Sequence, residues 1–201
     1  MARYNVWQNN GLRDVVARMD IADLHKDRGA FFGSIMGTLN HLLWGDIRWM
    51  SRFDGGAGSD LPIAQSTTLT ATPAIWAKDR VLMDARISRW AQNVDADCLN
   101  GDLHWQPVGT SDAMSTPMGL CATHLFNHQT HHRGQVHAML TNAGHTLPPT
   151  DLPFMPEDIY WLSSPLPAAS GAPLLPKASK PQASKATRFT TICFCPLFFA
   201  V

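Results

Sequence analysis

Apolar residues recur at helical spacing in four long stretches of this chain. The stretches run from about Arg3 to Met19, from about Phe31 to Phe53, from Thr72 to about Val94, and from about Ser115 to Asn142. Residues that cap or break helices bound them, such as the prolines that follow Thr72 and Thr116 and the glycines that follow Asp54. The periodicity predicts an all-α fold, a four-helix bundle in which each helix turns an apolar face to a common core.

The segments outside these helices predict long connections and a separate tail. Loops of roughly 20 residues join the second helix to the third and the third to the fourth, long enough to fold over an opening. A short extended piece is expected between Leu103 and Val108. From Ser163 to Val201 the chain holds six prolines, four basic residues and no acidic one, a composition typical of disorder. We therefore expect a bundle over residues 1–162 and a low-complexity, disordered tail over residues 163–201.

The composition excludes several classes of function. With 16 basic and 16 acidic residues the formal net charge is zero, so no general electrostatic field attracts nucleic acid or an anionic membrane. No apolar run has the length of a membrane span, and the N-terminus is too polar for a secretory signal. The four cysteines form no regular framework. These features predict a soluble cytoplasmic protein with reduced thiols and no nucleic-acid or membrane partner.

The strongest candidate chemistry lies in the last predicted helix. On a helical wheel one stripe of this helix contains Cys121, Leu125, His128, His132, Gln135, Met139 and Ala143. His128 and His132 are four residues apart, so their rings lie one turn above the other and can bind one metal ion at about 2.0–2.1 Å each. The alternative is a pair of core histidines satisfied by hydrogen bonds. Two desolvated imidazoles on one apolar stripe favour the metal.

A third ligand is expected from the second predicted helix, where His41 is the natural candidate. Periodicity alone does not decide for it, because His41 falls beside the main apolar stripe, near Arg48 and Arg52. Asp46 lies within that stripe, where a carboxylate needs a partner. It either accepts an N–H from a metal-bound histidine or forms an ion pair with an arginine.

The other histidines carry weaker signals. His124 and His131 lie on the flank of the stripe and His137 on the opposite side, while His25, His104 and His145 lie in loops or near helix ends. The string from His128 to His132 matches part of the His-Glu-x-x-His signature of zinc peptidases. Gln129 occupies the position of the general base and cannot accept a proton from water, which excludes a peptidase.

Three strings of this sequence resemble the DinB/YfiT-like family of metal-dependent four-helix bundles: AFFGSI at 30–35, LNHLL at 39–43 and HLFNHQTHHRGQ at 124–135. The resemblance extends from about Arg3 to Pro156, roughly three quarters of the chain. In that family one histidine of the second helix and two of the last, four apart, hold the metal. The resemblance therefore implies His41, His128 and His132 as ligands and the homodimer as a common state.

The sequence departs from that family in the second helix. Relatives tend to have Asp-Arg-Ile-Trp where this chain has Asp46-Ile47-Arg48-Trp49. The exchange moves a positive charge by about 100° around the helix, to the side that carries His41. Arg48 is expected to repel the cation or to narrow its pocket.

Three neutral imidazoles leave coordination positions open, which is typical of a catalytic site. The resemblance implies a metal-dependent transferase or isomerase that activates a low-molecular-weight thiol, since related proteins include thiol-dependent S-transferases and a mycothiol-dependent maleylpyruvate isomerase. Two alternatives stay open: a metal-dependent hydrolase with Asp46 as its base, and a non-enzymatic metal-binding or stress-related bundle. The cofactor is expected to be one divalent ion, and zinc, nickel and iron all accept imidazole.

Overall fold

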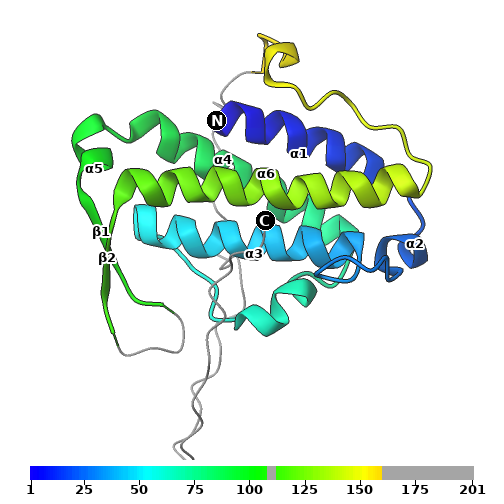
Figure 1. Ribbon diagram of the computed structural model, residues 1–201, viewed down its shortest axis with the longest axis horizontal. Coiled ribbons are helices and arrows are strands. Elements are labelled where there is room, and N and C mark those ends of the chain that lie inside the picture. The colour runs from blue at the N-terminus through cyan, green and yellow to red at the C-terminus, as the bar shows by residue number, and fades with distance from the viewer. Residues whose placement is uncertain (108–111, 160–201) are drawn as a thin grey trace, which may run out of the picture. The chain divides into compact units, whose positions relative to one another are not determined.

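The computed structural model describes residues 1–107 and 112–159. It confirms the all-α fold, with four long helices: α1 (Ala2–Val16), α3 (Ile35–Asp54), α4 (Pro73–Asn93) and α6 (Met118–Asn142). α1 packs against α4 and α6, and α3 packs against the same two helices, which closes the bundle (Figure 1). The predicted tail, residues 163–201, lies outside the described residues.

The second long helix begins later than the sequence pattern suggested. The expected start was Phe31, but α3 begins at Ile35, because Gly33 adopts a positive φ of 72° and turns the chain before it. Ser34 then caps the helix, with its Oγ accepting a hydrogen bond from the Gly37 N–H. At the other end Gly55, with φ of 68°, terminates α3 in the left-handed conformation.

The sequence predicts that two helices start at a Thr-Pro pair, and the structure confirms one of these starts. Thr72 caps α4, where its Oγ1 accepts a hydrogen bond from the Ile75 N–H. The expected helix start near Ser115 and Thr116 is wrong, because strand β2 (Met114–Pro117) pairs there with strand β1 (Asp102–Trp105). The ladder holds Thr116 extended opposite Leu103, so α6 begins only at Met118. β1 confirms the expected extended piece.

Short elements occupy the connections between the long helices and the segment after α6. They are α2 (Ile21–His25), the 3₁₀ turn η1 (Ile63–Thr68), α5 (Ala96–Asn100) and the 3₁₀ turn η2 (Leu152–Phe154). The connection that contains η1 packs along α3 (Figure 1). The loop between α3 and α4 therefore covers one side of the bundle, as its length suggested.

The apolar core lies between the four long helices. Its most deeply buried side chains include Leu24, Ile35, Leu39, Met50, Trp76, Ile87, Leu125 and Leu140. None of the helices in the described part of the chain combines the length and the hydropathy needed to cross a lipid bilayer.

A charged cluster also lies inside the bundle, and we call Asp46, Arg80 and Asp84 the ion-pair network. Arg80 Nη1 lies 2.6 Å from Asp46 Oδ2, and its Nη2 lies 2.9 Å from Asp84 Oδ1. Each of the three side chains is at most 2% exposed. Asn9 of α1 donates to Asp84 at 2.8 Å. Of the two roles open to Asp46, the ion pair with an arginine is the one that forms.

Candidate metal centre

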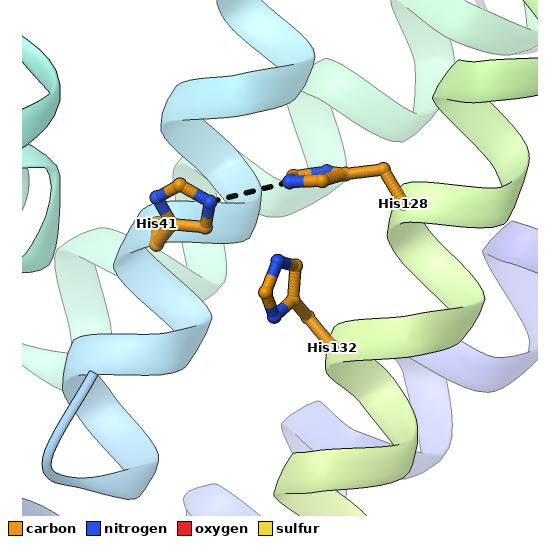
Figure 2. A group of neighbouring side chains, drawn as sticks. All are labelled: His41, His128 and His132. Carbon is orange, nitrogen blue, oxygen red and sulfur yellow. Dashed lines mark hydrogen bonds between the residues drawn. The ribbon is translucent and has the colours of Figure 1, made fainter. Parts of the chain in front are cut away.

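Three histidine side chains from two helices converge between α3 and α6. His41 comes from α3, and His128 and His132 come from successive turns of α6 (Figure 2). Each offers one ring nitrogen, and the three nitrogens lie within 4.8 Å of one another. We call these three residues the histidine triad. α3 and α6 pack directly on each other, which brings residues 87 positions apart together.

The spacing of two of these rings fits a shared metal ion. His41 Nε2 and His128 Nε2 face each other at 3.2 Å. Two nitrogens that each lie about 2.05 Å from one ion are about 3.3 Å apart at a tetrahedral angle. The observed separation is therefore close to that of two ligands of one ion.

Polar contacts on the far side of two rings fix their orientation. His132 Nδ1 lies 2.8 Å from Gln135 Oε1, and because that oxygen only accepts, Nδ1 carries the proton and Nε2 keeps its lone pair. His41 Nδ1 lies 3.0 Å from the hydroxyl of Ser66, which is supplied by η1. Partners of this kind hold metal-binding imidazoles in position. His128 Nδ1 is buried without a partner among the described residues.

Burial keeps the triad neutral. It lowers the pKa of His41 to about 3 and that of His128 to about 2, with neighbouring histidines adding to the effect. Burial also lowers the pKa of His132, although the hydrogen bond to Gln135 opposes the shift. At neutral pH the three rings therefore present lone pairs rather than charges, which is the state in which imidazole binds a cation.

Aromatic rings close around the triad. Phe32 stacks on His41 with ring centroids 3.8 Å apart and tilts over His132 at 5.3 Å. Trp44 stacks on His41 at 5.6 Å. Apolar walls of this kind limit the access of water and strengthen electrostatic interactions at the nitrogens.

The absence of a side chain at Gly45 leaves space for the His128 ring. A Cβ atom at this position would lie 2.9 Å from His128 Cε1, closer than side chains normally approach. A glycine within a helix costs stability, so its presence in α3 is explained by the close approach of the ring. Sequence reasoning missed Gly45 and also Ser66; only the packing of α3 on α6 and of η1 on α3 reveals them.

The remaining histidines lie outside the triad. His124 is exposed and contacts Trp49, and its ring centroid lies 5.7 Å from that of His128. His131 is exposed, and its Nε2 lies 3.3 Å from Gln135 Nε2. His137 is half-buried. His25 and His104 are exposed.

Arg48 points towards the loop rather than into the triad. Its Nη1 donates to the Ser59 carbonyl at 2.5 Å, and its guanidinium lies 5.5 Å from the centre of the Trp44 ring. Trp44 contacts both Arg48 and His41, so Arg48 lies on the side of α3 that carries His41, as the sequence indicated.

Comparison with known proteins agrees with this arrangement. The model of the DinB family matches residues 1–161. Protein DinB of Bacillus subtilis (strain 168) is 29% identical over 152 residues, which cover 74% of this chain and 87% of that protein. The residues that the family model matches include all three histidines of the triad.

Proposed function

This chain belongs to the DinB family, and on that premise we propose that it binds one divalent metal ion through His41, His128 and His132. The observation that carries the proposal is the convergence of three ring nitrogens within 4.8 Å. Neutral imidazoles from two helices form a ligand set that suits zinc, nickel or iron.

We further propose that the bound ion serves a transferase that activates a low-molecular-weight thiol. A divalent ion held by three imidazoles lowers the pKa of a thiol or water in an open coordination position. Ser66 and Gln135 orient two of the rings, and Phe32 and Trp44 limit the access of water. Family resemblance supports the thiol as the activated group. It also supports a homodimer in the cytoplasm, and sedimentation analysis would test the dimer.

The hydrolase alternative has less support. A hydrolase needs a base to take a proton from water, and Asp46 was the candidate for that role. Its carboxylate is fully buried and lies 2.6 Å from Arg80 in the ion-pair network, on a different face of α3 from His41. A thiol ionises far more readily than water and depends less on such a base.

Metal analysis of purified protein tests the ligands. The wild type is expected to hold about one equivalent of metal, and His41→Ala, His128→Ala and His132→Ala are each expected to lose most of it. His104→Ala, which alters an exposed histidine of β1, is the matched control and keeps the metal. A full equivalent retained by all three triad variants would refute the assignment.

A cobalt-substituted protein tests the chemistry. A small thiol is expected to shift the visible spectrum of the cobalt, and thiol transfer to an electrophile is expected to require the same loaded protein. Turnover of an ester without any thiol would favour the hydrolase instead. If a thiol does not shift the spectrum and no ester is turned over, but removal of the metal by a chelator unfolds the protein, the metal is structural.

A further inference from the structure

The face of α3 and α6 that carries the triad continues as an aromatic and cationic surface. The His124 ring lies 5.7 Å from His128 and 5.0 Å from Trp49. The guanidinium of Arg52 contacts two indoles, 4.6 Å from the ring centre of Trp49 and 4.2 Å from that of Trp105 of β1. We call His124, Trp49, Arg52 and Trp105 the arginine–tryptophan strip.

A second guanidinium lies beside this strip. Arg48 and Arg52 are one turn apart on α3, and Arg48 is linked to His41 through Trp44, which contacts both. Aromatic side chains thus connect each arginine to the triad: Trp44 connects Arg48 to His41, and Trp49 and His124 connect Arg52 to His128. His124 is exposed, and Arg48, Trp49 and Arg52 are half-buried, so a ligand can reach the strip.

Among the described residues, no carboxylate neutralises the charge of these two guanidinium groups at contact distance. Within residues 1–107 and 112–159, neither Arg48 nor Arg52 forms an ion pair within 4.0 Å, whereas Arg80 and Arg86 both do. Asp60 attracts Arg48 from further away. Burial and the like charge of Arg48 lower the pKa of Arg52 to about 10. Two adjacent half-buried cations repel each other, and an anion between them would relieve that repulsion.

We propose that Arg52 and Arg48 bind an oxyanion group, a carboxylate or a phosphate, of the ligand that reaches the histidine triad. The planar guanidinium of Arg52, which packs against both indoles, presents a fork of N–H donors that matches such a group. The inference rests on the proposed function because it assigns the charge of the ligand at the same site. Arg48 lies seven residues after His41, roughly 10 Å along the helix, so the ligand has its oxyanion at a comparable distance from its metal-binding atom.

Matched thiols test this inference on the cobalt-loaded protein. Mercaptohexanoate and mercaptohexanol differ in their terminal group, and the visible spectrum reports the binding of each. The wild type is expected to bind the acid about tenfold more tightly, the effect of one charge-assisted hydrogen bond, and salt should reduce the difference. Arg52→Met should lower the ratio to below about threefold, whereas Arg89→Met, at an exposed arginine of α4, should leave it unchanged.

A second arm works without metal and separates this inference from the proposed function. Succinate and inorganic phosphate are titrated into metal-free protein while tryptophan fluorescence is followed, because two of the seven tryptophans, Trp49 and Trp105, contact Arg52. A response that Arg52→Met abolishes supports the oxyanion site even in a protein that binds no metal, and the stronger of the two anions identifies the group. If Arg52→Met does not fold, Arg48→Met provides the same comparison. Equal binding of the acid and the alcohol by the wild type, with no response to either anion, would overturn the inference while the metal site stands.

Discussion

Two polar clusters inside the bundle both use α3: the ion-pair network joins α3 to α4, and the histidine triad joins α3 to α6. The ion-pair network receives Asp46 from α3, and it contains both signs of charge, because Arg80 lies between two carboxylates. The histidine triad receives His41 from α3 and two more bases from α6, and burial keeps all three neutral. The network balances its charges within the fold, whereas the triad brings together neutral rings whose lone pairs suit an added cation.

Neighbouring residues of α6 point to two different faces of the helix. His128 and His132 point to the triad, while Gln129 and Arg133, each one position later, are buried and hydrogen-bonded to each other at 3.0 Å. A step of one residue rotates a side chain by about 100° around a helix. The helix thereby presents one polar face to the Gln129–Arg133 contact and another to the histidine triad.

The largest expected effect comes from breaking the ion-pair network. Asp46→Ala should reduce the free energy of unfolding by about 3–5 kcal/mol, because it strips Arg80 of one of its two buried partners. Asp54→Ala is the matched control, since it removes another carboxylate of α3 that lies 2.6 Å from an arginine of α4, at a partly exposed site. It should cost about 1 kcal/mol or less. Urea denaturation measures both, and equal losses would show that burial of the pair is unimportant.

The triad should respond to metal instead. A divalent ion at 100 times its dissociation constant should raise the free energy of unfolding by about 2.7 kcal/mol, and the effect should vanish in His132→Ala. Thermal unfolding with and without chelator measures it. A variant that is still stabilised by the metal would place the ion elsewhere.

Gly45→Ala should separate stability from metal affinity. The new methyl group would lie 2.9 Å from His128 Cε1, so metal affinity should fall by about tenfold, equivalent to about 1.4 kcal/mol. Gly134→Ala on α6 is the control, because a Cβ atom there meets nothing within 4 Å. It should raise stability by up to about 1 kcal/mol through helix propensity and leave metal affinity unchanged. Isothermal titration measures the affinities, and equal values for the two variants would contradict the role of Gly45.

The smallest effect concerns acid and the metal-free protein. His41 and His128 have folded pKa values of about 3 and about 2, below the ordinary 6.5, so the unfolded chain takes up protons first as the pH falls through 6.5. Stability should therefore decrease from about pH 6.5 downwards, by on the order of 1 kcal/mol per pH unit. Asp84 acts in the opposite direction, because burial raises its pKa to about 6. Denaturation midpoints at several pH values measure the slope, which His128→Ala should reduce.

Local patterns predicted those parts of the molecule that depend on a single helix. Apolar spacing identified all four long helices, and the four-residue interval between His128 and His132 identified two members of the triad. The position of His41 depends on how α3 packs against α6, which a helical wheel of α3 alone cannot show. Family resemblance supplied that residue.

Contacts between distant segments could not be predicted in the same way. Ser66 reaches His41 from η1, and Arg80 reaches Asp46 from α4. Thr116 has a good capping side chain, but pairing with β1 overrides that local preference. Tertiary partners decided each of these cases, and they are not encoded at short range.

Anomalous diffraction from crystals of the metal-loaded protein tests the central claim most directly. A single peak about 2.0–2.1 Å from one ring nitrogen each of His41, His128 and His132 is the expected result. Full metal occupancy at any other position, or a protein that binds no divalent ion at all, would contradict the central claim.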